Sequence, residues 1–156
     1  MEKVIYTLGH SNRSLNDFLH ILMRYQIANL VDIRRFPTSR KYPYFNKDYL
    51  SSVLFKHGFK YYWLGNELGG YREGGYLKFM EKPEFKQGIR KLLRISLSNP
   101  TAIMCSEKFW FRCHRRFISD LLVKMGYRVI HIIDIDKTYE HKYRGYVNGL
   151  SYSTVE

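Results

Sequence analysis

Cysteine is scarce in this sequence, and long apolar runs are absent. Two cysteines among 156 residues cannot build a disulfide framework, so they are free thiols, ligands or one pair. The uncharged apolar stretches extend over only a few residues, which excludes a membrane-spanning helix. Residues 1–6 lack the apolar segment of a secretory signal, so we expect a cytoplasmic protein that does not associate with membranes.

Acidic side chains are also few. Asp and Glu number 14 against 26 Lys and Arg, which gives a formal net charge of +12 with His neutral. This excess is typical of proteins that bind an anionic partner, either nucleic acid or an anionic small molecule. It is also typical of very soluble proteins and of some thermophile proteins. The total charge leaves these alternatives open, and nothing in the sequence indicates the oligomeric state.

The length and the composition predict a single α/β domain over residues 1–156. Apolar residues make up 45% of the chain and charged residues 26%, as in ordinary globular proteins. We place the core at about residues 4–133. The tail, residues 134–156, is polar and rich in tyrosine, and no clear element is predicted there.

Short apolar runs alternate with amphipathic stretches along the core. The apolar runs predict five strands, at residues 4–8, 29–33, 59–64, 101–104 and 127–133. Helices are predicted after caps at Ser14 and Asn46, from Pro83, and from about Cys113. This alternation requires right-handed crossovers, so we expect an open, mainly parallel sheet of about five strands with helices on both faces. Residues 34–45 and 65–75 are predicted to be loops.

Reactive residue types gather where the predicted strands end. Ligands of open α/β sheets bind beyond the carboxyl ends of the strands. The sequence therefore predicts one composite site at that edge, made of His10, Ser11, Asp32, Arg34, Arg35, Glu67, Cys105, Glu107, His114 and Arg115.

The start of the fourth predicted helix breaks a local rule. A helix N-terminus carries partial positive charge and favours acidic residues. Here Arg112, His114, Arg115 and Arg116 gather instead, and a bound anion would resolve the conflict. Alternatively, Arg115 and Arg116 point to solvent or pair with nearby acids. Residues 34–47 likewise carry five cations and no acid.

Three residues are the candidate catalytic groups. His10 follows a strand and has an ordinary pKa near 6.5, which suits a general base. Glu107 could transfer protons or merely neutralise the arginines. Cys105 could be a nucleophile or a structural residue, whereas we expect Cys113 to be a small buried apolar residue. A zinc site that joins the two thiols to His10 and His114 matches no standard ligand spacing, so no metal and no cofactor are predicted.

Taken together, several short motifs resemble the domain-of-unknown-function family 488 over about residues 4–133. They are Tyr6 to Arg13, Leu30 to Arg40, Glu67 to Gly70, Met104 to Glu107, and Cys113 to Arg115. The family commonly carries Cys-Ala-Glu where this chain has Cys105-Ser106-Glu107. The resemblance implies a compact α/β domain and supplies no established reaction.

Two principal functions are compatible with these residues. One is an enzyme acting on a phosphorylated or nucleotide-like anionic substrate, with Arg34, Arg35 and Arg115 holding the anion. The other is a nucleic-acid-binding module in which Tyr42, Tyr44 and Phe45 stack on bases. The reactive residues at the strand ends favour the enzyme. A thiol or metal sensor that uses the two cysteines is a third option.

Overall fold

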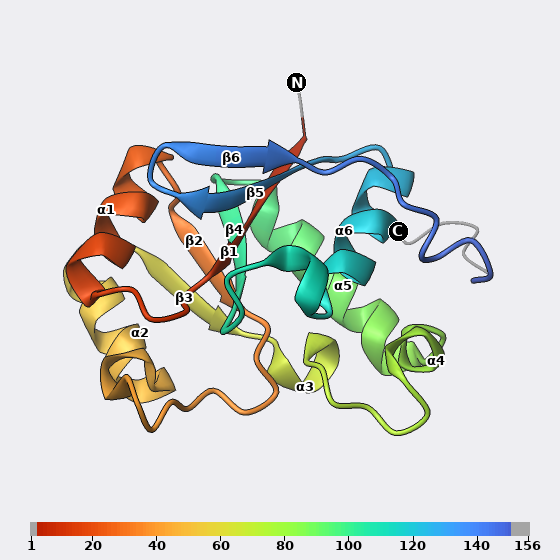
Figure 1. Cartoon of the computed structure of the whole chain (residues 1–156), viewed down its shortest axis with the longest axis horizontal. Helices are drawn as coiled ribbons and strands as arrows, with labels where there is room; N and C mark the ends of the chain where they lie inside the picture. Colours follow the sequence, from red (N-terminus) through yellow and green to blue (C-terminus); the bar gives the residue numbers. More distant parts are fainter. Residues whose placement is uncertain (1–2, 151–156) are drawn as a thin grey trace.

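The computed structural model describes residues 3–150 and contains one six-stranded sheet. Five strands are parallel, and the order β3-β2-β4-β1-β5-β6 places β1 inside the sheet (Figure 1). The strands are β1 (Val4–Gly9), β2 (Asn29–Asp32), β3 (Lys60–Trp63), β4 (Thr101–Cys105), β5 (Arg128–Asp134) and β6 (Lys137–Glu140). The open α/β sheet predicted from the alternating pattern is confirmed.

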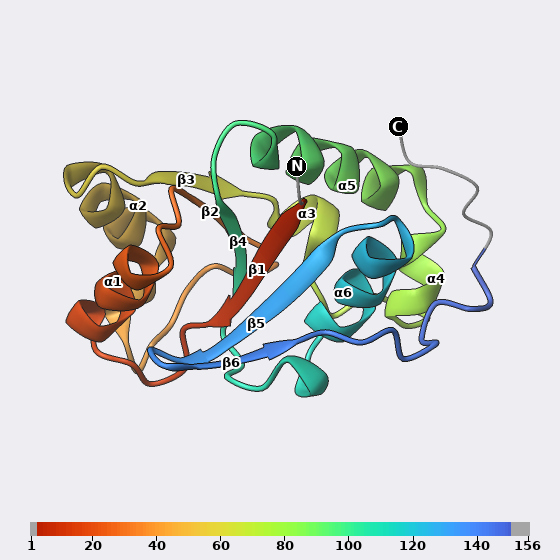
Figure 2. The ribbon, with the colours of Figure 1, turned by 90° about the horizontal axis from the view of Figure 1, so that it is seen from above.

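Helices cover both faces of the sheet (Figure 2). One face packs on α1 (Leu15–Arg24) and α2 (Lys47–Lys56). The other packs on α3 (Gly65–Leu68), α4 (Tyr76–Met80), α5 (Pro83–Ser96) and α6 (Arg115–Lys124). The central strands are buried on both sides, which explains why they appear in the sequence as continuous apolar runs.

Helix starts follow local sequence signals in two of three cases. The Ser14 hydroxyl accepts the backbone NH of Asp17 at 3.0 Å, and Pro83 occupies the first turn of α5. Asn46 precedes α2 as predicted, but its side-chain oxygen accepts the backbone NH of Ser39 at 2.5 Å instead of capping the helix. This bond ties the 34–45 segment to α2.

The chain after β5 differs from the sequence prediction. Residues 137–140 form β6, which pairs antiparallel with β5. Residues 151–156 of the predicted tail lie outside the described part. The 65–75 loop contains the short helix α3, and α4 begins directly after that loop. Within residues 3–150, every helix is too short or too polar to span a bilayer.

Candidate functional site

A cleft of about 770 Å³ opens at the carboxyl edge of the sheet. Its walls come from four separate segments, within residues 34–38, 70–76, 105–107 and 112–117. These segments follow β2, β3 and β4 and lead into α6, which is the arrangement expected of a ligand site in an open α/β sheet. Within residues 3–150, Glu107 is the one acidic residue that lines this cleft. Five arginines line it as well: Arg34, Arg35, Arg72, Arg112 and Arg116.

Four of these arginines have no salt-bridge partner in the described chain: Arg35, Arg72, Arg112 and Arg116. Arg35 donates to the Tyr71 carbonyl at 2.5 Å, and Arg72 donates to carbonyls of the 65–69 turn. Burial lowers the pKa of Arg72, and the nearby charge of Arg35 lowers it further. Positive charge is therefore crowded at the cleft.

Arg34 differs from the other four because it is neutralised by a buried acid. Its Nε and Nη2 donate to the two carboxylate oxygens of Asp32 at 2.9 and 2.7 Å. The Tyr61 hydroxyl also donates to this carboxylate, at 2.5 Å. Asp32 is completely buried, so its role in the structure is to hold Arg34 at the cleft wall.

His10 lies behind this pair and does not line the cleft. Its Nδ1 donates to the Ser11 carbonyl at 3.0 Å, and its Nε2 accepts from Arg34 at 3.3 Å. The ring stacks on Phe45 at a centroid distance of 4.4 Å. Burial lowers the pKa of His10 to about 4, so the imidazole is neutral near pH 7. Both nitrogens are engaged, which makes His10 a support for Arg34 in this geometry.

Glu107 lies in the cleft wall with a half-buried side chain. In the described chain its carboxylate makes no hydrogen bond and no salt bridge, whereas its backbone carbonyl accepts from Arg115. Gly9 makes this loop possible: a Cβ at Gly9 would lie 1.9 Å from the Glu107 carbonyl oxygen. Only glycine fits at position 9, so the Gly9-His10 motif packs directly against the Glu107 loop.

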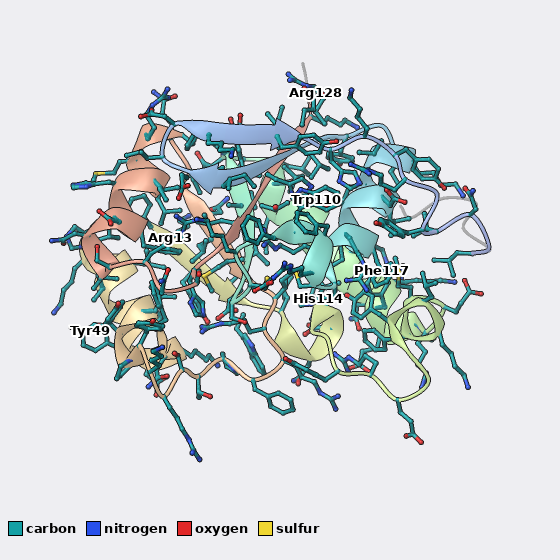
Figure 3. The ribbon with its side chains drawn as sticks, viewed as in Figure 1. Arg13, Tyr49, Trp110, His114, Phe117 and Arg128 are labelled. Carbon is teal, nitrogen blue, oxygen red and sulfur yellow. The ribbon has the colours of Figure 1, made fainter. Side chains whose placement is uncertain are left out.

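His114 and Arg115 follow each other in sequence but take different positions. His114 lines the cleft beside Phe117 at the start of α6 (Figure 3), and its Nε2 donates to the Ile33 carbonyl at 3.0 Å. Burial lowers the pKa of His114, so the ring is neutral near pH 7. Arg115 is 0% exposed and points into the interior, so its guanidinium does not face the cleft.

Both cysteines line the cleft, and their sulfur atoms are 3.2 Å apart. Cys105 is 3% exposed, whereas Cys113 is half-buried. Cys113 packs against the apolar core as expected, but it is only half-buried, and its sulfur also contacts a guanidinium and a second thiol. Residues 3–150 contain no group of three or more His, Cys, Asp or Glu side chains that could hold a metal ion, so the zinc set considered from sequence is not assembled.

Four other expected contributors lie outside the cleft. Glu67 pairs with Lys91 of α5 at 2.8 Å and does not line the cleft. The Ser11 hydroxyl donates to the side chain of its neighbour Asn12 at 3.4 Å. Among the residues expected to stack on bases, Phe45 is completely buried, and the Tyr44 hydroxyl donates to the Arg13 carbonyl at 2.8 Å.

Two features were missed from the sequence. The first is the cleft wall from the glycine-rich loop, where Tyr71 is 84% exposed beside Phe36, which is 62% exposed. Tyr71 has φ +58°, a strained backbone conformation that often marks a functional loop. The signal for this wall in the sequence was Tyr71 and Arg72, which lie between two pairs of glycines.

The second missed feature is a buried hydrogen-bond chain. The Thr7 hydroxyl bonds His131 at 2.5 Å, His131 bonds His141 at 2.9 Å, and His141 bonds Asp120 at 2.8 Å. Arg115 donates to Thr7 at 3.0 Å and so begins the chain. A histidine inside the apolar run of β5 was its signal in the sequence.

The fold and the cleft together define an open α/β protein with an arginine-rich pocket at the carboxyl ends of its parallel strands. Residues 14–122 match the family described as domain of unknown function DUF488, and the chain belongs to this family. No curated protein and no solved structure matches the chain.

Proposed function

We propose that this protein is an enzyme that acts on a phosphorylated or nucleotide-like substrate bound in the arginine-lined cleft. The observation that carries the proposal is the charge of the cleft, which within residues 3–150 is lined by four arginines without salt bridges and by one acidic residue. A phosphate group matches the fork of donors that guanidinium groups present.

The arginines divide into two roles in this proposal. Arg116 lies in the first turn of α6 and Arg112 three residues before that helix, whereas Arg35 and Arg72 come from the segments that follow β2 and β3. These four hold the anion. Arg34, whose charge Asp32 offsets, fixes the shape of the wall and receives the support of His10.

Proton transfer falls to Glu107 in this proposal. Its carboxylate is the unpaired acidic group of the cleft within residues 3–150, and it lies among cations that an anionic substrate would partly neutralise. His10 lacks a free ring nitrogen, and His114 keeps its Nε2 on the Ile33 carbonyl. We therefore assign the exchange of a proton with bound substrate to Glu107.

Nucleic-acid binding without catalysis is the second candidate. The exposed Phe36 and Tyr71 rings lie 6.1 Å apart at the cleft, and Arg35 bonds the Tyr71 backbone. Aromatic rings beside guanidinium groups can stack on unpaired bases of a single strand. This pair takes the place of the tyrosines that the sequence suggested.

The test is a thermal-shift and isothermal binding screen with inorganic phosphate, nucleotides and sugar phosphates, followed by assays for turnover of each binder. Arg116→Ala should weaken binding of a phosphate-bearing ligand by about 1.5–3 kcal/mol, the range for hydrogen bonds to charged groups. Arg94→Ala, an exposed position on α5 outside the cleft, is the control with the same loss of charge.

The outcomes separate the candidates. Turnover that Glu107→Gln abolishes while binding persists supports the enzyme. Binding to single-stranded oligonucleotides that falls steeply with salt and is lost in Phe36→Ala, with no turnover of any small ligand, supports the binding module. Equal affinity in Arg116→Ala and Arg94→Ala would contradict both.

A further inference from the structure

The two cysteine sulfurs form a close pair. Cys105 ends β4 and Cys113 lies two residues before the first residue of α6, yet the Sγ–Sγ distance is 3.2 Å. A disulfide needs a separation of about 2.05 Å, so the sulfurs must approach by only about 1 Å. The two sulfurs therefore start close to bonding distance.

A buried cation contacts both sulfurs. The Nε of Arg115 donates to Cys105 at 3.1 Å and to Cys113 at 3.3 Å. Its remaining bonds go to the Thr7 hydroxyl and to the backbone carbonyls of Glu107 and Lys108, which are all neutral acceptors. Within residues 3–150, no carboxylate lies within salt-bridge distance of this guanidinium.

A charge buried without a partner costs several kcal/mol. Arg115 is 0% exposed and cannot lose its proton near neutral pH. The two thiols are the contacts of Arg115 that can ionise, so a thiolate on one of them would balance its charge. Burial opposes charge on Arg115, but Cys105 and Cys113 raise its pKa on balance. The structure therefore favours one shared proton on the two thiols.

The contacts of Cys113 suit it better than Cys105 to carry the negative charge. Its Sγ accepts the backbone NH of Arg115 at 3.4 Å, in the first turn of the ten-residue helix α6. The partial positive charge of a helix N-terminus stabilises a thiolate. The hydrogen bond with Cys105 lowers the pKa of Cys113 well below its usual value, whereas burial raises that of Cys105. Cys113 is also the more exposed of the two thiols.

We propose that Cys113 and Cys105 form a redox-active dithiol centre in the cleft wall, in which Cys113 reacts with a peroxide and Cys105 resolves the product to an intrachain disulfide. This centre is independent of the proposed phosphate chemistry. Its substrate class is hydrogen peroxide or a small organic hydroperoxide that enters through the cleft.

The reaction balances in two steps. The Cys113 thiolate attacks one peroxide oxygen, the O–O bond breaks, and a Cys113 sulfenic acid and hydroxide form; the hydroxide takes a proton from water or buffer. The Cys105 sulfur then attacks the sulfenic sulfur, the S–O bond breaks, and water leaves with the Cys105 proton. The peroxide gains two electrons, and the two thiols lose them. An external thiol returns the pair to its reduced form.

The test treats the reduced full-length chain with one equivalent of hydrogen peroxide and no phosphate-bearing ligand. Intact-mass spectrometry after alkylation counts the thiols. In wild type, both thiols should become resistant to alkylation together, and the mass should fall by two hydrogen atoms. The rate of this oxidation should be at least about tenfold higher than for cysteine in an unstructured peptide. Cys105→Ser should accumulate a sulfenic acid that dimedone traps on Cys113.

Two controls complete the test. Cys113→Ser should leave Cys105 unoxidised in the folded protein. Arg115→Lys should slow oxidation, and Arg94→Lys should match wild type. If Arg115→Lys does not fold, the two serine variants still decide. Oxidation of Cys113→Ser at the wild-type rate, or two free thiols in oxidised wild type, would overturn the proposal. Neither result bears on the anion-binding screen.

Discussion

Arg34 donates two hydrogen bonds to the carboxylate of Asp32, at 2.9 and 2.7 Å, and both side chains are almost completely buried. Within residues 3–150, the one hydrogen bond of the next side chain, Arg35, goes to a backbone carbonyl, and this side chain stays partly exposed. The two consecutive arginines therefore have different roles: Arg34 supports the cleft wall, and Arg35 lies at its surface.

This difference predicts unequal effects on stability. Arg34→Ala should lower the free energy of unfolding by about 3–5 kcal/mol, because it leaves Asp32 charged and buried. Arg35→Ala should cost less than about 1 kcal/mol. Urea titrations followed by circular dichroism measure both. Equal losses would mean that the ion pair does not stabilise the fold.

The buried imidazole of His10 predicts a pH dependence. The unfolded chain takes up a proton at His10 below pH 6.5, whereas the folded chain does so only near pH 4. The contribution of His10 to stability is therefore complete above pH 6.5 and is lost as the pH falls toward 4, a change of about 3 kcal/mol from a shift of this size.

The variant His10→Gln isolates this contribution, since glutamine can still accept from Arg34 and does not titrate. Unfolding free energies of wild type and variant, measured over the same pH range, should converge as the pH falls. Parallel curves would show that His10 is not the titrating group.

Asp120 anchors the chain after β6. Its oxygens accept His141 at 2.8 Å and the backbone NH groups of Arg144 and Tyr146 at 2.8 and 2.7 Å. Asp120→Asn should destabilise the protein by about 2–4 kcal/mol, because one acceptor becomes a donor facing a donor. Hydrogen exchange should show loss of protection over 137–150 before β4 loses it. Asp136→Asn, at an exposed turn, should change neither measurement.

The proposed dithiol centre also predicts an oxidising potential. Reduction restores the contact between thiolate and guanidinium, so the reduced form is favoured and the disulfide is easily reduced. Equilibration in glutathione buffers should give a potential less negative than the value of about −270 mV for thioredoxin. A more negative potential would mean that Arg115 does not stabilise the reduced pair.

Much of the fold could be predicted because strong local patterns specify it. Leu15, Phe18 and Leu22 recur at helical spacing, and the strands are apolar runs buried on both faces. The strand β6 was missed because Lys137, Thr138 and Glu140 are polar and exposed, and it forms only by pairing with β5. The strand β6 depends on its pairing with β5, and the pattern of a short sequence segment does not show such pairing.

The candidate site stays a prediction, and the structure shows where its residues lie. The strand-end rule points to the edge of the sheet at which the cleft opens, and Arg34, Arg35, Cys105, Glu107 and His114 line that cleft. Sequence could not show that Arg115 turns inward while Arg116 faces the cleft, because that choice depends on where the two sulfurs lie. Contacts between distant segments decide side-chain direction at such edges.

The position of β1 has a practical consequence for trimming this protein. The family match covers residues 14–122, which include all the cleft segments but omit β1, β5 and β6. A fragment cut at those limits would leave β4 as a bare sheet edge and uncover apolar side chains on both faces, which invites aggregation. The stretch of chain that is similar to its relatives and the stretch that can fold by itself therefore have different boundaries.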